Sequence, residues 1–237
     1  MHKFQMTWSS LKTHYQETLK EGYEFWTCRQ FALGKSERPE RLVVNRVDVD
    51  LSLKKADRLL DIYDELGIKA SFFIRLHAPE YNPFDFENYR ILKRMRDSGH
   101  EIGYHSEVVD QAAIWIEDPE LCLKRDLKVL SAMLDIEVDS IASHGGMTGL
   151  NNLDFWKTRR AEDFGCLYEA YDETSVFGLF KSSRYVSDSE WYQWKSYHEG
   201  TLREGDRRDF SEHAKEGLPL IYLLVHSDTY FDRHFYE

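Results

Sequence analysis

Short apolar segments alternate with amphipathic segments along most of the 237-residue chain, and this alternation restricts the possible folds more than any other feature. The apolar segments are rich in branched residues, as strands are. The amphipathic segments carry apolar residues at helical spacing, and one of them lies between the capping residue Ser52 and the stop residue Gly67. The predicted strands cover residues 41–47, 68–74, 101–104, 138–142, 166–171, 184–186 and 218–225. The predicted helices cover residues 7–21, 53–66, 88–98, 119–134, 152–164 and 208–215.

Strands that are separated by helices pair in parallel through right-handed crossovers. Seven strands in this order indicate an α/β fold, namely a seven-stranded (β/α) barrel that is incompletely closed. An open, doubly wound sheet gives the same order of elements and stays an alternative. We expect one domain over residues 1–237, with residues 1–40 as an N-terminal helical extension, because no repeat or flexible linker interrupts the pattern.

The charge balance and the hydropathy argue against two classes of partner. Asp and Glu total 42 against 31 for Lys and Arg, so the net charge is -11, and such a surface repels the phosphate backbone of nucleic acid. The longest apolar run, residues 220–225, is far shorter than the ~20 residues of a transmembrane segment. Because the amino-terminal residues are polar and the three cysteines lack the spacing of a disulfide framework, we expect a cytoplasmic protein.

Side chains that bind metals or transfer protons follow the carboxyl ends of five predicted strands. In parallel α/β folds these ends lie on one rim, where ligands bind. The rim residues are Asp48 and Asp50, Arg75 and His77, His105, Ser143 and His144, and His226. Their joint placement favours a functional site over a set of unrelated loop residues.

Arg46, Asp48 and Asp50 are spaced two residues apart on the first of these strands and therefore point to one face. The cation of Arg46 would favour the ionised form of Asp48, which a general base needs. An equally simple interpretation is a structural Arg46–Asp48 ion pair, with Asp50 capping the next helix. Together with His105 and His144, Asp50 makes a two-histidine, one-carboxylate set that is typical of catalytic metal sites, and we predict a divalent metal ion, with zinc as the first choice.

Three of these segments resemble motifs of the polysaccharide deacetylase (NodB-homology) family of carbohydrate esterases. The resemblance extends over residues 41–230, and residues 46–50, 99–106 and 223–226 carry the motifs. Residues 67–73 and 81–84 resemble signatures of a divergent subgroup linked to surface-polysaccharide biosynthesis.

The resemblance implies a role for each matching residue. Asp48 and Asp50 are similar to the family's Asp-x-Asp motif, in which the first aspartate is the catalytic base and the second binds the metal. His105 matches a histidine that is a metal ligand in the family. His226, in a Leu-x-x-His motif, matches the general acid.

The sequence departs from the family pattern at two points. Val109 stands where the second metal-binding histidine belongs, so the third ligand must come from elsewhere. His144 is our first choice for this ligand, with Glu107 and Asp110 as alternatives. The family's arginine motif, which orients the base, is also absent, and Arg46 is expected to replace it because it shares a face with Asp48.

We therefore expect a metal-dependent hydrolase that removes an N-acetyl or similar acyl group from a sugar, such as a nucleotide-linked or lipid-linked intermediate of surface-polysaccharide biosynthesis. Asp188, in a loose match to another family motif, is expected to orient a catalytic group. The predicted substrate-site residues are Arg46, Arg75, Asn82, Asp188 and Trp191. One alternative is a non-catalytic carbohydrate-binding protein with a decayed metal site, and another is a metal-free glycosidase that uses Asp48 and Asp50 as its carboxylate pair. The sequence leaves the oligomeric state open.

Overall fold

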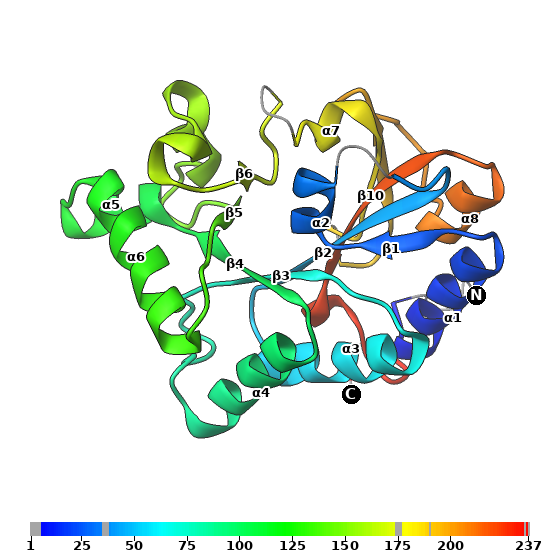
Figure 1. The fold of residues 1–237 in the computed structure, drawn as a ribbon, viewed down its shortest axis with the longest axis horizontal. Helices are drawn as coiled ribbons and strands as arrows, with labels where there is room; N and C mark the ends of the chain where they lie inside the picture. The colour runs from blue at the N-terminus through cyan, green and yellow to red at the C-terminus, as the bar shows by residue number, and fades with distance from the viewer. Residues whose placement is uncertain (1–5, 35–37, 174–176, 190, 235, 237) are drawn as a thin grey trace.

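The computed structural model describes residues 6–34, 38–173, 177–189, 191–234 and 236. Helices pack around one curved sheet (Figure 1), in which seven parallel strands follow the order β6-β5-β4-β3-β2-β10-β7. These strands are β2 (Leu42–Val49), β3 (Ser71–Ile74), β4 (Glu101–Ser106), β5 (Ser140–Ser143), β6 (Tyr168–Glu169), β7 (Arg184–Ser187) and β10 (Leu220–His226). No pairing joins β6 to β7 within the described ranges, so the prediction of an incompletely closed (β/α) barrel is confirmed.

Three short strands extend this sheet. β8 (Lys195–His198) pairs antiparallel with β7, and β9 (Thr201–Leu202) pairs antiparallel with β8. β1 (Glu24–Trp26) pairs in parallel with the first residues of β2. The segment 1–40, expected as a helical extension, therefore also supplies a strand to the central sheet. None of these three strands was predicted from the sequence.

The longer helices lie outside the curved sheet (Figure 1). They are α1 (Trp8–Lys20), α3 (Leu53–Leu66), α4 (Phe86–Asp97), α6 (Pro119–Leu134) and the shorter α8 (Phe210–Lys215). Local signals set their ends: the Ser52 side chain accepts a hydrogen bond from the Lys55 N–H at the start of α3, and Gly67 ends that helix with a φ of 68°. Helix α6 has the predicted bounds, because Asp118 caps it and Pro119 starts its first turn.

Two hydrophobic cores lie on the two faces of the sheet, because neighbouring residues of a strand face opposite sides. Val43 and Val47 of β2 belong to the outer core, under the helices, whereas Leu42 and Val44 belong to the inner core. The inward-facing set of β2 continues through Arg46 to Asp48 at the carboxyl end of the strand. The same alternation that builds the core therefore brings charged groups into the interior.

The inner core is filled so tightly that one strand position excludes any side chain. Gly103 of β4 lies beside the ring of Phe73, and a Cβ at Gly103 would come within 2.4 Å of that ring. Only glycine lets β4 pass Phe73 at this distance.

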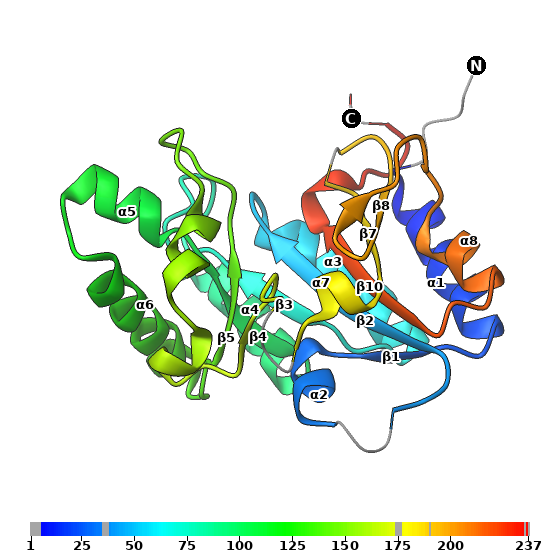
Figure 2. The same cartoon turned by 90° about the horizontal axis from the view of Figure 1, so that it is seen from above.

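Helix α2 (Cys28–Leu33) closes the amino end of the barrel. The Cys28 N–H donates to Ser71 Oγ at 2.7 Å, and the Arg29 N–H donates to Glu101 Oε2 at 2.8 Å. Figure 2 shows α2 at the lower end of the sheet, whereas η3 (Ser227–Thr229), which follows β10, lies at the upper end. Of the two ends of the barrel, the helix therefore leaves the carboxyl end of the strands accessible to a ligand.

The region after β5 differs from the prediction. Residues 152–164 were predicted as one helix but form two 3₁₀ helices, η1 (Asn152–Thr158) and η2 (Ala161–Phe164), separated by extended backbone at Arg159. The Asn152 side chain binds Val109, Asp110 and Gly145, which fixes the start of η1 from outside the segment. The predicted strand 166–171 shrinks to the two residues of β6. Helices α5 (Val108–Trp115) and α7 (Leu179–Ser182) were not predicted.

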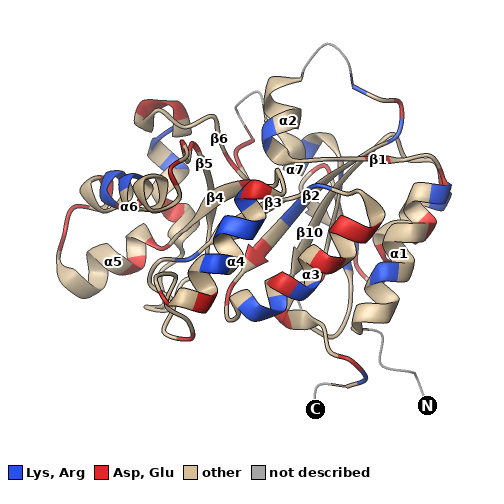
Figure 3. Cartoon of the chain, turned by 60° about the horizontal axis from the view of Figure 1, so that its bottom comes forward, with Lys and Arg blue, Asp and Glu red and all other residues tan. Residues whose placement is uncertain are grey.

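Acidic and basic residues are interspersed on the outer helices (Figure 3). Arg94 of α4, for example, pairs with Asp57, Asp61 and Asp64 of α3 at 2.6, 2.8 and 2.7 Å. No helix within the described residues is both long and apolar enough to cross a membrane.

Candidate active site

Five of the predicted rim residues meet at the carboxyl end of the barrel. Asp48 and His226 are the last paired positions of β2 and β10 and lie side by side in the register of the two strands. Asp50 follows β2, His105 lies near the end of β4, and His144 follows β5. The shared direction of the parallel strands therefore brings together groups that are up to 178 positions apart, from Asp48 to His226.

Asp50, His105 and His144 form a cluster that fits a metal ion, since one atom from each lies within 4.8 Å of the others. Nε2 of His105 is 3.2 Å and Nε2 of His144 is 4.0 Å from Asp50 Oδ1. Asp50 Oδ1 is buried and lacks a hydrogen-bond partner among the described residues. Nδ1 of His105 lies 2.8 Å from the Ala142 carbonyl; if it carries the proton, the Nε2 lone pair is directed at Asp50. This donor set suits zinc or a similar divalent ion.

The two alternative third ligands are engaged elsewhere. The Asp110 carboxylate accepts hydrogen bonds from the Met147 and Thr148 N–H groups and from Asn152, so it organises the loop after β5. Glu107 Oε1 accepts from Arg75 Nη2 at 2.7 Å and lies 3.6 Å from Nδ1 of His144. Glu107 thus lies behind His144, on the side away from Asp50.

Asp48 is held by Arg46 through two hydrogen bonds, from Nε to Oδ1 at 2.8 Å and from Nη2 to Oδ2 at 2.6 Å. Both side chains are buried, and the Arg46 guanidinium also lies 4.5 Å from the centre of the Tyr171 ring. Burial alone would raise the pKa of Asp48, but Arg46 and His105 outweigh it and lower the pKa below its usual range. The predicted ion pair is therefore present, whereas the cap of α3 is Ser52 and not Asp50.

His226 is held by Asp188 in a similar way. Nδ1 of His226 lies 2.6 Å from Asp188 Oδ1, and the His226 backbone N–H donates to the same carboxylate. Burial favours the neutral imidazole, but the carboxylates of Asp188, Asp50 and Asp48 outweigh it and raise the pKa of His226 to about 9. Nε2 of His226 lies 3.9 Å from Asp50 Oδ2, so the protonated edge faces the cluster.

The other three predicted substrate residues, Arg75, Asn82 and Trp191, differ in how exposed they are and in their hydrogen-bond partners. Arg75 is 3% exposed, and its guanidinium donates to the Asp50 carbonyl at 2.8 Å and to Glu107. Asn82 is exposed, and its Oδ1 accepts from the Phe84 N–H in a local turn. Trp191 is 42% exposed and has a φ of 64°. Arg46 and Arg75 thus lie beneath the rim, with their charges already paired.

His77, the other rim histidine, is turned away from the cluster. Its Nε2 lies 2.9 Å from Asp126 Oδ2, and its ring contacts Trp115.

Sequence reasoning missed two groups beside the cluster. Asp228 is buried, accepts the Leu51 N–H at 2.9 Å, and has a pKa raised to about 6 by burial and by Asp50. The Tyr81 hydroxyl donates to the Val49 carbonyl at 2.9 Å. Asp228 follows His226 by two residues, the same spacing that singled out Asp48 and Asp50, so this signal was available.

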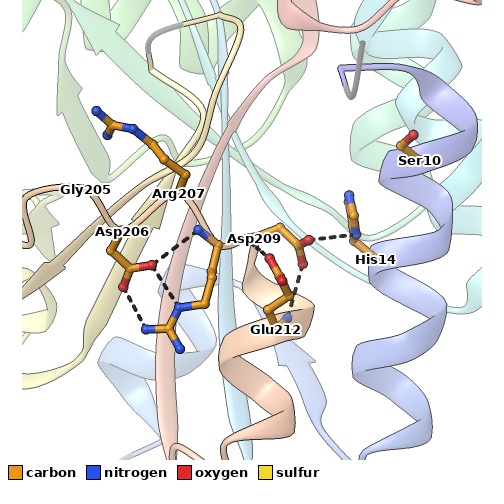
Figure 4. A pocket seen from close by; sticks show the side chains of 8 residues that line it. Ser10, His14, Gly205, Asp206, Arg207, Asp209 and Glu212 are labelled. Carbon is orange, nitrogen blue, oxygen red and sulfur yellow. Dashed lines mark hydrogen bonds and ion pairs between the residues drawn. The ribbon is translucent and has the colours of Figure 1, made fainter. Parts of the chain in front are cut away.

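A separate hollow lies between α1 and the loop before α8 (Figure 4). Its carboxylates are engaged: Asp209 caps α8 and pairs with His14 at 3.2 Å, and Asp206 pairs with Arg208 at 2.8 Å. No described contact links its lining residues to Asp50, His105 or His144, so it is not part of this site.

Comparison with known proteins identifies relatives by structure and not by sequence. No protein-family model and no curated protein sequence matches the chain. A CE4 esterase from Streptococcus mutans aligns with a TM-score of 0.50 and 15% identity, over 87% of this chain and 81% of that chain. A polysaccharide deacetylase from Bacillus cereus aligns with a TM-score of 0.46 and 16% identity, over 79% of each chain.

A CE4 family pseudoenzyme from Bacillus anthracis aligns with a TM-score of 0.47 and 17% identity, over 81% of this chain. The chain spans only 58% of the length of that pseudoenzyme, and 60% of its mutant with restored activity. The likeness to the Streptococcus mutans esterase shows that the chain has the (β/α)-barrel fold of a CE4 esterase.

Proposed function

We propose that the protein is a metal-dependent hydrolase that removes an N-acetyl or similar small acyl group from a sugar. The observation that carries this proposal is the convergence of Asp50, His105 and His144 within 4.8 Å, with Asp48 and His226 at its edge. A metal site, a base and an acid on one rim are the groups that metal-assisted hydrolysis of an amide uses.

The metal ligands in this proposal are Asp50, His105 and His144, and zinc is the metal that suits them best. When bound, such an ion lowers the pKa of water from about 15.7 to about 7 and stabilises negative charge on the acyl oxygen. The Ala142 carbonyl would hold His105 by its far nitrogen, and Glu107 Oε1 lies 3.6 Å from the far nitrogen of His144.

Asp48 and His226 divide the proton transfers between them. Asp48, held ionised by Arg46, accepts the proton of the water that attacks the acyl carbon. His226, held protonated by Asp188, donates a proton to the amine nitrogen as the carbon–nitrogen bond breaks. Each transfer contributes roughly 10²–10⁴ in rate.

The substrate in this proposal is an intermediate of surface-polysaccharide biosynthesis, supported by the resemblance of residues 67–73 and 81–84 to that subgroup. Three buried free cysteines support residence in a reducing compartment such as the cytoplasm. Because the charges of Arg46 and Arg75 are paired beneath the rim, neither is available to a substrate phosphate. The substrate contacts that remain proposed on the accessible surface are Asn82 and Trp191.

The test compares the wild-type protein with Asp48→Asn, both loaded with zinc. We expect the wild type to release acetate from N-acetylated sugars, and Asp48→Asn to lower turnover by about 10²–10⁴ while it still binds one zinc per chain. Elemental analysis and an acetate assay measure the two quantities. A purified wild type that holds no stoichiometric zinc would support the non-catalytic alternative, and a cleaved glycosidic bond would support the glycosidase.

A further inference from the structure

The peptide that joins Asp50 to Leu51 is held on both sides by buried side chains of opposite charge. The Arg75 guanidinium donates to the Asp50 carbonyl at 2.8 Å. The Asp228 carboxylate accepts from the Leu51 N–H at 2.9 Å. Arg75 is 3% exposed and Asp228 is 4% exposed. We call Arg75 and Asp228 the peptide clamp.

The peptide clamp comes from the two strands that flank β2. In the sheet, β2 lies between β3 and β10. Its pairing with β3 ends at Val49, and its pairing with β10 ends at Asp48. Arg75 directly follows β3, and Asp228 follows β10 by two residues. Side chains from the neighbouring strand ends therefore satisfy backbone groups that lie beyond both ladders of β2.

The signs of the two charges match the dipole of the Asp50–Leu51 peptide. A peptide unit is negative at its carbonyl oxygen and positive at its N–H. The cation of Arg75 lies at the negative end, and the carboxylate of Asp228 lies at the positive end. Hydrogen bonds to charged groups are stronger than those between neutral groups. The peptide is therefore fixed more firmly than a loop peptide with neutral partners.

The carboxylate of Asp50 takes no part in the peptide clamp. Its Oδ1 is buried, lacks a hydrogen-bond partner among the described residues, and lies 3.2 Å from Nε2 of His105 and 4.0 Å from Nε2 of His144. At the starts of α4 and α6, by contrast, the carboxylates of Asp85 and Asp118 cap the helix. Asp50 is fixed through its backbone instead, and its carboxylate is left for a ligand.

Arg75 connects the peptide clamp with a second proposed metal ligand, His144. Its Nη2 donates to Glu107 Oε1 at 2.7 Å, and the same oxygen lies 3.6 Å from Nδ1 of His144. Glu107 is buried as well. One planar guanidinium therefore reaches the Asp50 carbonyl through Nη1 and the carboxylate beside His144 through Nη2. Because the guanidinium is a rigid fork, it fixes the angle between these two contacts.

Further contacts hold the two clamp residues at their own backbone. Lys55 of α3 donates through Nζ to the Asp228 carbonyl at 2.8 Å. The Tyr81 hydroxyl accepts from the Arg75 N–H at 3.0 Å. The positions of both clamp residues are therefore set independently of the peptide that they hold.

We propose that Arg75 and Asp228 are positioning residues for the metal. They hold the Asp50–Leu51 peptide so that the Asp50 carboxylate keeps one direction, and Arg75 relates this direction to His144 through Glu107. This inference rests on the proposed function for the metal at the Asp50 cluster. It assigns Arg75 to metal binding in place of the substrate contact expected from the sequence.

The test measures the zinc Kd by competition with a chromophoric chelator, and the stability of the zinc-free protein by its melting temperature. We expect Asp228→Ala to weaken zinc binding by ~10- to 100-fold, as is typical for the loss of a partner that orients a metal ligand. Asp228→Asn keeps an acceptor for the Leu51 N–H, so its zinc Kd should stay within ~3-fold of the wild-type value. This rescue separates the hydrogen bond from the charge of Asp228.

Asp139→Ala is the matched control for the loss of a buried carboxylate. Asp139 is 7% exposed and pairs with Arg29 at the amino end of the barrel, away from the cluster. We expect this variant to lower the melting temperature of the zinc-free protein and to leave the zinc Kd unchanged. A purely structural role of Asp228 would give the same result in Asp228→Ala.

A second variant guards against loss of folding in Asp228→Ala. Arg75→Lys keeps a positive charge beside Glu107 but lacks the fork that reaches two partners, so we expect zinc binding to weaken by about 10-fold. An unchanged zinc Kd in Asp228→Ala and Arg75→Lys, an equal loss in Asp228→Ala and Asp228→Asn, or the same loss in Asp139→Ala would overturn the proposal.

The two proposals fail in different ways. If the zinc-loaded wild type releases acetate and the clamp variants keep the zinc Kd of the wild type, the clamp proposal fails and the proposed function stands. If zinc affinity depends on the clamp as expected but no acetate is released, the proposed function fails and the clamp proposal stands. A wild type that binds no zinc would overturn both.

Discussion

Three side chains of the proposed mechanism have a hydrogen-bond partner on the side away from the cluster. Arg46 holds Asp48, Asp188 holds His226, and the Ala142 carbonyl holds His105. Because these partners are buried, each functional group is restricted in orientation and in charge before a ligand binds.

The acid role of His226 predicts a dependence on the leaving group. We expect His226→Gln to lower amide hydrolysis by about 10²–10⁴, because an amine must be protonated as it leaves. Hydrolysis of p-nitrophenyl acetate should fall much less, because nitrophenolate leaves without a proton. Initial rates with both substrates measure the difference, with Asp48→Asn as the control that lowers both. Equal losses for the amide and the ester in His226→Gln would contradict the role of His226 as the acid.

The sequence could predict which residues meet at the rim, because strand ends and the two-residue spacing of a strand are local signals. Asp48, Asp50, His105, His144 and His226 were all found in this way. The sequence could not predict that the Arg75 guanidinium binds the Asp50 carbonyl and the Glu107 carboxylate. These partners lie 25 and 32 positions away from Arg75 in the chain.

At the scale of elements, local capping signals predicted helices best. Helix α6 matches its prediction at both ends, because Asp118 and Pro119 mark its start in the sequence itself. The segment 152–164 was predicted wrongly, because contacts to Asp110 and Gly145 from outside the segment decide its conformation. Helical spacing cannot distinguish an α-helix from two 3₁₀ turns when distant side chains supply the hydrogen bonds.

His100 makes the packing of β4 against α3 sensitive to pH. It is 7% exposed between the rings of Tyr63 and Phe72, and its Nδ1 accepts the Ala70 N–H at 3.2 Å. Burial, with a smaller effect of Lys69, lowers the pKa of His100 to about 4. The unfolded chain, with a pKa of about 6.5, binds the proton more readily, so stability falls as the pH drops from about 6.5 to 4.

We expect His100→Asn to reduce this loss, because Asn keeps an acceptor for the Ala70 N–H but does not titrate. The wild type should lose up to about 3 kcal/mol more unfolding free energy than the variant between pH 7 and pH 4. Urea unfolding of both proteins at the two pH values measures this difference in unfolding free energy. The contributions of the other titrating groups are the same in both proteins and cancel. The same pH dependence in both proteins would show that His100 does not contribute.

At the scale of the whole molecule, the barrel is closed at one end and open along one side. Helix α2 closes the amino end through Cys28, Arg29 and Phe31, and these contacts connect segments that are far apart in the chain. No pairing joins β6 to β7 within the described residues, so the sheet is open on that side. The order of the strands and the incomplete closure of the barrel could be predicted from the sequence, but the closure of the amino end by α2 could not, because it depends on packing between distant segments.

If the rim binds zinc only when the seven strands hold their ligands together, zinc must stabilise the folded chain. A zinc concentration ~100-fold above Kd adds about 2.7 kcal/mol, which for a chain of this size raises Tm by about 5–10 °C over the chelator-treated protein. Asp50→Asn should abolish this rise, whereas Asp97→Asn, on the exposed end of α4, should keep it. Thermal unfolding of the wild type, Asp50→Asn and Asp97→Asn, each with zinc and with chelator, measures the rise in Tm. A rise of equal size in Asp50→Asn would mean that zinc binds elsewhere, since Asp50 is the carboxylate to which both imidazoles are directed.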